Sequence, residues 1–399
     1  MQAVTLVVVS PLRCVVRGDT RVLLTRKFVD GLGLYQELWK GPLTVVCERS
    51  DQASDNLDNV EVDLDRAPFR VVTLDLREET LRDALVPRSL VLSAVQFAWC
   101  SRLTRAAGVP CVYVSEYTLQ TRLQIVGESR IGFLRRVRRS WFERRAEAAQ
   151  RKALSQAQGV QCNGIPTYDA YRALTPMPLL FFDTRIEESQ LAKPERVRER
   201  CARFARERKL RLVFSGRLNR MKGVQDLPVV AAELKRRGVP FELSICGDGE
   251  LLEELRASVA GLHLEDSVKF RGVLDFKTEL VPFVTQETDL FVCSHLQGDP
   301  SCTYLETMSC GVPIVGYDNE AFQGLAKTAG VGWATPLGRP VELADRIAAL
   351  SQDPEGLRQA SERSLMFAGN HTFEKTFRRR IEHLDQVTAA FQESPGAHS

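Results

Sequence analysis

Short apolar runs alternate with helical segments along nearly the whole chain, and this alternation limits the possible folds more than any other feature. In the first half, runs rich in Val, Leu and Ile span residues 4–10, 43–48, 70–76, 89–95 and 109–115. In the second half, similar runs span residues 211–216, 241–246, 267–272, 289–294 and 312–317. Helical patterns lie between them at 28–40, 96–107, 224–237 and 251–260. Strands separated by helices indicate parallel sheets with crossover helices, so we predict an α/β fold.

A charged helical stretch at about 186–209 interrupts this alternation. Domains of roughly 100–200 residues are usual, so 399 residues favour two or three of them. We predict an N-terminal domain over 1–185 and a second over 186–370. The segment 371–399 has apolar residues at helical spacing, which predicts a helix with one apolar face: 373, 377, 381, 384 and 387.

The composition excludes several classes of protein. Lys and Arg number 54 against 51 Asp and Glu, so a dedicated nucleic-acid binder is not expected. No apolar run reaches the length of about 18 residues that a membrane span needs. We expect the run at 4–10 to form a first strand and not a secretory signal. Ten scattered cysteines without a C-x-x-C pair argue against a zinc ribbon and indicate buried thiols in a cytoplasmic protein.

One candidate site follows the strand at 211–216. This strand ends in Ser215 and Gly216, and the cations Arg217 and Lys222 come just before a helix. Ligands of open α/β sheets bind beyond the carboxyl ends of the strands, and a glycine lets the backbone approach a phosphate closely. The alternative is that both cations are ordinary solvated surface residues.

A second candidate site lies at 289–317, where a strand, a loop, a short helix and another strand follow closely. Asp299 suits the N-cap of this helix, Pro300 its first position and Gly311 the position after its end. The free amides near Ser301, Cys302 and Thr303 would then form an anion site. Glu306 would lie about two turns into the helix, either accepting hydrogen bonds from sugar hydroxyls or exposed on the surface.

The order and spacing of these motifs resemble the retaining glycosyltransferases of family four. The matching segments are 215–218, 222–223, 245–251, 268–272, 288–294 and 304–316. The resemblance is strong over about 209–350, whereas the first half is similar only in its strand–helix layout. It implies the GT-B architecture, in which two Rossmann-like domains face each other across a deep cleft. The N-terminal domain over 1–185 would bind the acceptor, and the helix over 371–399 would cross back to it.

The resemblance also implies roles for the residues of the second half. The C-terminal domain would bind a nucleotide-diphosphate sugar, with Gly216, Arg217 and Lys222 at the diphosphate. The amides of 301–303 would assist, Glu306 would bind the ribose, and Val273 would lie against the base. No metal or other cofactor is expected, and the leaving diphosphate would help to deprotonate the acceptor hydroxyl.

Three departures from the family's pattern concern the reaction centre. The family usually has a pair of glutamates, E-x7-E, but Gly298 stands where the first would be. Asp299 or Gln297 would then take over the contact with the donor sugar. All five histidines lie at 263 or later, so the usual N-terminal histidine is absent as well. Glu116, after the strand at 109–115, holds a similar place and is either an active-site residue or an ordinary loop residue.

Two further positions near the expected cleft are open to interpretation. His295 lies close to the donor motif, but a structural role at the strand end explains it equally well. The family's N-terminal Gly-Gly loop is the third missing feature. The residues after the first strand that would line the cleft instead are Arg13, Arg17, Gly18 and Asp19.

The segment 130–152 holds nine Arg or Lys and two Glu, with apolar residues at helical spacing. A basic helix with exposed aromatic residues suits an anionic membrane surface. A solvated basic face of a domain helix and a nucleic-acid site are the alternatives, the last disfavoured by the balanced total charge. The membrane interpretation predicts a peripheral protein on the inner face of the cytoplasmic membrane.

The sequence thus predicts a retaining glycosyltransferase of the hexosyltransferase type. It would transfer a sugar from a nucleotide-diphosphate donor to a hydroxyl of a glycan or lipid-linked sugar, in cell-surface polysaccharide or glycolipid biosynthesis. The alternatives are a sugar-nucleotide epimerase of the same fold and a nucleotide-sugar-binding subunit that has lost its activity.

Overall fold

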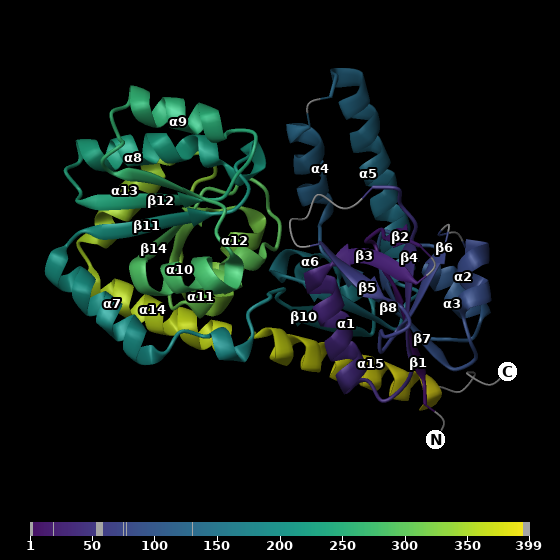
Figure 1. Cartoon of the computed structure of the whole chain (residues 1–399). Coiled ribbons are helices and arrows are strands. Elements are labelled where there is room, and N and C mark those ends of the chain that lie inside the picture. The colour runs from purple at the N-terminus through teal and green to yellow at the C-terminus, as the bar shows by residue number, and fades with distance from the viewer. Residues whose placement is uncertain are drawn as a thin grey trace.

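Two α/β units lie side by side in the computed structural model of the chain (Figure 1). The structure describes residues 3–18, 20–52, 59–74, 76, 78–129 and 131–393. Each unit is built on a parallel sheet covered by helices, which confirms the predicted α/β fold.

The N-terminal unit contains a sheet of seven parallel strands in the order β10-β9-β8-β7-β1-β4-β6. The strands are β1 (Thr5–Val9), β4 (Leu43–Glu48), β6 (Arg70–Leu74), β7 (Ser89–Ala94), β8 (Cys111–Ser115), β9 (Gly159–Asn163) and β10 (Met177–Phe181). Side chains of a strand point alternately to its two faces. Leu6 and Val8 therefore pack toward one face and Val7 and Val9 toward the other, so both faces are buried.

Helices cover both faces of this sheet. They are α1 (Arg26–Leu38), α2 (Glu78–Ala84), α3 (Cys100–Ala106), α4 (Leu119–Glu128), α5 (Phe133–Leu154) and α6 (Ile165–Tyr171). Helix α1 packs with the core that contains Leu6, and α3 with the core that contains Val7. Helices α4 and α5 pair and project from the unit as a hairpin (Figure 1).

The C-terminal unit has a sheet of six parallel strands in the order β13-β12-β11-β14-β15-β16. The strands are β11 (Leu210–Ser215), β12 (Phe241–Cys246), β13 (Val268–Gly272), β14 (Leu290–Cys293), β15 (Ile314–Tyr317) and β16 (Trp333–Thr335). Its helices are α7 (Pro194–Glu207), α8 (Leu227–Arg236), α9 (Leu252–Gly261), α10 (Val281–Glu287), α11 (Cys302–Ser309), α12 (Glu320–Ala329), α13 (Pro340–Ser351) and α14 (Pro354–Gly369). The strands and helices predicted in this half are present, with ends that differ by a few residues.

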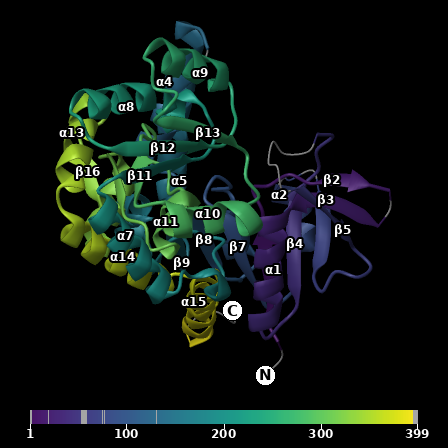
Figure 2. The same ribbon diagram turned by 60° about the vertical axis from the view of Figure 1, so that its left-hand side comes forward.

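The last helix, α15 (Phe373–Glu393), extends from the C-terminal unit beneath the N-terminal one (Figures 1 and 2). It contacts α1 and β10. Its apolar face is buried in the core of the N-terminal unit through Phe373, Phe377, Ile381, Leu384 and Val387. The boundary that we placed between 185 and 186 falls in the connection between β10 and α7.

Several strands of the first half were not predicted. A small antiparallel sheet is formed by β2 (Val15–Arg17), β3 (Arg21–Thr25) and β5 (Asn59–Asp63). Strands β9 and β10 at the edge of the large sheet were missed as well. No helix in the described part of the chain has the length and apolarity needed to cross a membrane. The cysteines are all free and most are buried, as predicted.

Candidate active site

The loop after β11 brings a lysine to the carboxyl end of the sheet. Gly216 follows the strand, and a short turn over Arg220–Lys222 is capped by the Asn219 side chain, which accepts from the Lys222 amide at 3.1 Å. Gly223 then has φ +62°, and a Cβ there would lie 1.8 Å from the carbonyl oxygen of Ser294. Only glycine fits this position, and the close approach fixes Lys222 against the end of β14.

Lys222 is buried and paired with Asp299. Its Nζ lies 3.1 Å from Oδ2 of that aspartate, in the loop before α11. Arg217 is exposed, so its guanidinium is accessible to a ligand. The structure therefore places the two predicted cations differently. Lys222 is buried beside a carboxylate, and Arg217 is open to solvent.

Helix α11 starts later than predicted. Ser301 is its N-cap and Cys302 its first residue, so the expected N-cap at Asp299 and first helical position at Pro300 are wrong. The physical reason is that Asp299 accepts from Lys222 and does not cap the helix. The Ser301 amide donates to the Asp299 carbonyl, which leaves Cys302 and Thr303 as the first-turn amides without an acceptor inside the helix.

The end of α11 agrees with the prediction. The helix stops at Ser309, and Gly311 follows the C-cap with φ +65°. A left-handed residue at this position is a common way to end a helix.

Glu306 is buried in α11 and not exposed on the surface. Its Oε1 accepts from Nε of Arg185 at 2.8 Å. The guanidinium of Arg185 also lies 3.8 Å from the ring centre of Phe276, in the segment after β13. Val273, in the same segment, is 58% exposed. Glu306 is therefore held by an arginine that the sequence did not single out.

Gly298, the position of the missing first glutamate, lies against the N-terminal unit. Its amide donates to Oε1 of Gln124 at 3.1 Å, and its carbonyl accepts from Oγ1 of Thr121 at 3.1 Å. A Cβ on Gly298 would lie 3.0 Å from Cβ of Glu320. The Glu320 carboxylate accepts from Thr118 at 2.9 Å. The contact between α4 and this loop therefore occupies the space that a glutamate side chain would need.

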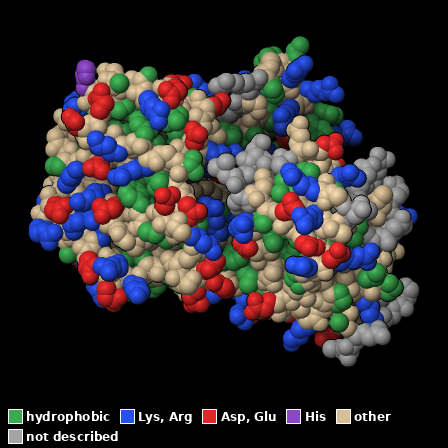
Figure 3. All heavy atoms as spheres, viewed as in Figure 1, with side chains coloured by type: hydrophobic (Ala, Val, Ile, Leu, Met, Phe, Trp, Pro, Cys, Tyr) green, Lys and Arg blue, Asp and Glu red, His purple; other side chains and the backbone are tan. Residues whose placement is uncertain are grey.

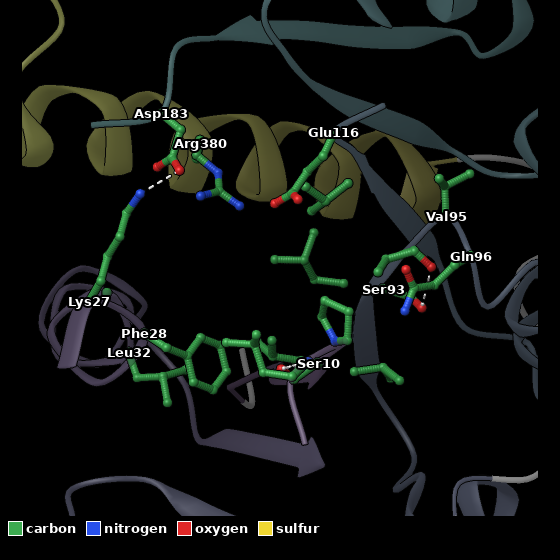
Figure 4. Close-up of a pocket in the computed structure, with 18 of the residues that line it drawn as sticks. Ser10, Lys27, Phe28, Leu32, Ser93, Val95, Gln96, Glu116, Asp183 and Arg380 are labelled. Atoms are coloured by element: carbon green, nitrogen blue, oxygen red, sulfur yellow. Dashed lines mark hydrogen bonds and ion pairs between the residues drawn. The ribbon is translucent and has the colours of Figure 1, made fainter. Parts of the chain in front are cut away.

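A cavity of about 430 Å³ opens beyond the carboxyl ends of β1, β7 and β8 (Figure 4). Asp183, Arg380 and Glu116 lie along one edge of it, Phe28 and Leu32 lie across from them, and Lys27 reaches from α1 to Asp183. The cavity is close to the donor motif because Nζ of Lys27 lies 2.9 Å from Sγ of Cys302, the first residue of α11.

Lys27 is fixed by an ion pair with Asp183, at 2.5 Å. Burial alone would lower the pKa of Lys27, but the Asp183 carboxylate outweighs it and raises the pKa above the usual range. Burial acts to raise the pKa of Asp183, yet the attraction of Lys27 lowers it. Burial raises the pKa of the Cys302 thiol to about 12, so this side chain is neutral. A charged Lys27–Asp183 pair thus stands at the N-terminus of α11.

Glu116 lines the cavity from the end of β8. The surrounding protein raises the pKa of its carboxyl group, and the negative charge of Asp183 adds to this effect. No hydrogen bond from the described residues reaches this carboxylate. Tyr117 also lines the cavity. Burial is the largest cause that raises the pKa of its hydroxyl, the negative charges of Glu116 and Asp299 raise it further, and Arg217 lowers it. Tyr117 therefore lies between the cavity and the donor motif.

The other positions named from the sequence are not part of this arrangement. His295 is fully buried, which lowers its pKa well below the usual value, and its Nδ1 lies 3.4 Å from the hydroxyl of Tyr304, as expected for a structural histidine. Gln297 is buried. No side-chain hydrogen bond to another described residue fixes its amide where the missing glutamate would lie.

Among the described residues, the predicted cleft residues Arg13, Arg17 and Gly18 do not line this cavity. Arg13 pairs with Glu48 at 2.8 Å, and Arg17 is exposed at the end of β2. Gly18 takes φ +63° in the turn after β2, and Asp19 lies outside the described residues. The cavity wall uses the earlier residues Ser10, Pro11 and Leu12 instead.

No group of His, Cys, Asp and Glu suited to a metal ion is present among the residues that the structure describes. The polar groups that the site offers are cations and helix amides on the donor side and a carboxylate in the cavity. Such an arrangement can stabilise a leaving group that gains negative charge.

Sequence reasoning missed Lys27, Asp183, Arg185 and Tyr117. Asp183 follows β10 closely, so recognising residues 177–181 as a strand would have made it a candidate at a strand's carboxyl end. Nothing in the local sequence marks Lys27, because its partners are 156 and 275 residues away.

Comparison with known proteins agrees with this geometry. Residues 197–367 match the family model of the glycosyl transferases group 1. The alpha-D-kanosaminyltransferase of Streptomyces kanamyceticus is 29% identical over 144 residues, which are 36% of this chain and 37% of that enzyme. The amylovoran biosynthesis glycosyltransferase AmsK of Erwinia amylovora is 31% identical over 151 residues, 36% of each chain. The chain thus matches little more than a third of the length of these relatives.

The fold comparison covers nearly the whole chain. The crystal structure of Anabaena HepE in complex with UDP superposes with a TM-score of 0.68 at 15% identity, covering 97% of this chain and all of that one. This likeness concerns the fold alone and confirms the expected architecture of two Rossmann-like units. Residues 197–367 are thus similar to the glycosyl transferases group 1, and the chain as a whole has the GT-B fold.

Proposed function

We propose that the protein is a retaining glycosyltransferase that uses a nucleotide-diphosphate sugar. The observation that carries the proposal is the meeting of three positive features beyond the carboxyl ends of the C-terminal sheet. Arg217 and Lys222 follow β11, and the Lys222–Asp299 pair places Lys222 beside the loop that leads into the N-terminus of α11. Helix N-termini and cations together suit a diphosphate.

In this proposal the bond between the anomeric carbon and the diphosphate oxygen breaks, and the diphosphate leaves with the bonding electrons. Arg217, Lys222 and the amides of Cys302 and Thr303 stabilise the negative charge that develops on it. The acceptor oxygen forms the new bond to the anomeric carbon on the same face, and its proton passes to the leaving diphosphate. Glu306 binds the ribose, and Val273 lies against the base.

The experiment is an incubation with UDP-, GDP- and ADP-sugars, with and without a membrane extract as a source of acceptor. We expect release of one nucleoside diphosphate to depend on the extract, together with a new glycoside. Conversion of the donor to an epimer without release would favour an epimerase. Binding without turnover would favour an inactive binding subunit.

We further propose that α5 docks on an anionic membrane, which would bring a lipid-linked acceptor to the enzyme at the cytoplasmic leaflet. The outer part of α5 exposes apolar side chains: Phe133 (75%), Leu134 (81%), Val137 (52%), Trp141 (59%) and Phe142 (62%). Basic residues lie beside them, and Figure 3 shows both kinds of side chain on the projecting hairpin. Apolar anchors flanked by cations suit lipid headgroups and the acyl boundary. A polysaccharide or glycolipid product follows from such an acceptor.

Liposome flotation tests this second proposal. Vesicles with anionic lipid should carry the wild-type protein, and salt should weaken the binding. Replacing Arg135, Arg136, Arg138 and Arg139 with Glu should abolish it. A charge-matched control replaces four exposed arginines of the C-terminal unit with Glu: Arg196, Arg198, Arg206 and Arg236. Unchanged flotation of the α5 variant, or equal loss in the control, would refute membrane docking by α5.

A further inference from the structure

The cavity of the N-terminal unit differs in chemistry from a site for a sugar. Its wall is mostly aliphatic and aromatic, and five large apolar side chains contribute to it: Phe28, Leu32, Val95, Phe373 and Phe377. Four of these are nearly buried, at 1–8% exposure, so the wall belongs to the packed core of the unit. A glycan against these side chains would place hydroxyl groups on carbon atoms, which is unfavourable. Polar side chains lie elsewhere in the wall, at Ser10, Thr25, Ser93 and Gln96.

The charged groups of the cavity are confined to its edge. Asp183, Arg380 and Glu116 lie along one side in Figure 4, and Lys27 reaches to Asp183 from α1. Arg122, which also lines the cavity, is paired with Glu147 and Gln150. Lys27 joins this side to Cys302 at the start of α11. A hydroxyl group that reacts with a donor bound at α11 must therefore lie at the charged edge, with the rest of the acceptor extending into the apolar part.

One buried polar group is left for the ligand in the apolar wall. The hydroxyl of Tyr35, a residue that is only 5% exposed and lines the cavity, has no hydrogen-bond partner among the described residues. Buried hydroxyls are nearly always hydrogen-bonded, so an unpaired one in a cavity wall suits a bound molecule with a single polar group within its body.

We propose that this cavity binds the acceptor and that the acceptor is amphiphilic, with an apolar body inside the cavity and the reacting hydroxyl at Glu116. The volume of about 430 Å³ lies within the usual range of ligand sites for small molecules, so the cavity selects a body of limited length. A free hydrophobic alcohol and the hydroxyl-bearing end of a lipid share this chemistry. The inference rests on the proposed transferase activity and narrows its acceptor.

The test uses the full-length enzyme with the donor found in the panel experiment. The acceptors are 1-hexanol, 1-octanol and 1-decanol, vesicles containing diacylglycerol, and, as polar acceptors, glycerol and methyl glucoside. Glycoside formation, measured by mass spectrometry, should be faster with an apolar acceptor than with either polar one. Transfer to the soluble alcohols indicates a free alcohol as the natural source, and transfer to the vesicles alone indicates a lipid. Faster transfer to glycerol or methyl glucoside than to every apolar acceptor would overturn the proposal.

Two variants link the result to the cavity. Leu12→Asp places a charge in the cavity wall, and Ala94→Phe fills part of the volume. Val229→Asp, on the exposed surface of α8, is the matched control for the introduced charge. The KM for the apolar acceptor should rise about tenfold or more in both cavity variants and stay at the wild-type value in Val229→Asp. Equal acceptor KM values in the wild type and in a folded cavity variant would overturn the assignment.

A binding measurement separates this inference from the transferase proposal. The fluorescent probe 8-anilinonaphthalene-1-sulfonate should bind to the protein without any donor, and 1-octanol should displace it. Both effects should be lost in Ala94→Phe. If no donor is turned over but the displacement is seen, the transferase proposal fails and the apolar site stands. If turnover is seen and octanol displaces nothing, the apolar site fails.

Discussion

Nζ of Lys27, in the first turn of α1, lies 2.9 Å from Sγ of Cys302, the first residue of α11. This contact joins the N-terminal cavity to the helix whose amides face the expected diphosphate. Asp183 holds the ammonium group in place. The two units therefore share one polar centre, although each contributes its residues from a separate sheet.

Replacing Lys27 should slow the reaction, because its charge stands where the leaving group becomes negative. We expect Lys27→Met to lower kcat by about 10²-fold, and Lys27→Arg to retain part of the rate. The exposed neighbour Arg26 offers a matched control as Arg26→Met. Steady-state kinetics with saturating donor measure the effect. A kcat for Lys27→Met equal to that of the control would remove Lys27 from the mechanism.

Glu116 should make the fold less stable as the pH rises. Because the pKa of its carboxyl group is raised in the folded protein, the folded state binds this proton more tightly than the unfolded state does. Stability is therefore present at low pH and is lost as the pH rises from the ordinary glutamate pKa through the folded one. At pH 8 the free energy of unfolding of Glu116→Gln should therefore be higher than that of the wild type.

The difference between Glu116→Gln and the wild type should vanish near pH 3, well below the ordinary glutamate pKa of about 4.3, where the Glu116 carboxyl is protonated in both the folded and the unfolded state. Denaturant unfolding at several pH values measures it. The same variant should lose activity if Glu116 contacts the acceptor hydroxyl. A wild type more stable than Glu116→Gln at pH 8 would contradict the inferred direction of the pKa shift.

Restoring the family's first glutamate should damage this protein. In Gly298→Glu the new side chain meets Glu320 and the threonines of α4, and two carboxylates come close together. We expect a loss of about 1–3 kcal/mol in the free energy of unfolding, the usual cost of overpacking. Thermal unfolding of Gly298→Glu and of the smaller Gly298→Ala compares the two. A Gly298→Glu variant as stable as Gly298→Ala would contradict the inference that the contact with α4 fills this space.

Glu306 should determine recognition of the ribose. We expect Glu306→Ala to raise the donor KM and to reduce the preference for a ribonucleotide over its deoxyribose analogue by about tenfold, since hydrogen bonds to a charged acceptor are among the stronger ones. Isothermal titration with the nucleoside diphosphate and its deoxy form reports this preference directly.

The variant Arg185→Ala tests whether Arg185 only positions Glu306 while Glu306 itself contacts the ribose. It leaves the carboxylate in place but removes its partner at 2.8 Å, so affinity should change while the preference for ribose remains. An undiminished preference in Glu306→Ala would mean that another group binds the ribose.

The elements of the fold that could be predicted are mostly those whose sequence signal comes from neighbouring residues. The strand–glycine–cation pattern at 211–223 and the Gly311 helix end depend on a few neighbouring residues, and the structure has them where expected. The hairpin of β2 and β3 was missed although its signal is local, with a Val-Val run shortly before Gly18 and a Val-Leu-Leu run shortly after it. The third strand, β5, pairs across about 40 residues and had no such signal.

The candidate site was less predictable than the fold because its contacts join distant segments. The start of α11 was misjudged because Asp299 binds Lys222, 77 residues away, and not the helix. The Glu306–Arg185 pair spans 121 residues. Lys27 and Asp183 come together only when α1 and the end of β10 meet at the sheet edge. Sequence motifs therefore identified the donor side, and tertiary structure was needed for the cavity.

The central claim is that a nucleoside diphosphate leaves from Arg217 and Lys222, and its most direct test is the turnover of the corresponding alanine variants. With the donor that the wild type uses, Lys222→Ala and Arg217→Ala should each release the nucleoside diphosphate about 10²-fold or more slowly. Lys327→Ala, at an exposed lysine of α12, should match the wild type. Near-normal release by folded Lys222→Ala and Arg217→Ala would contradict the account.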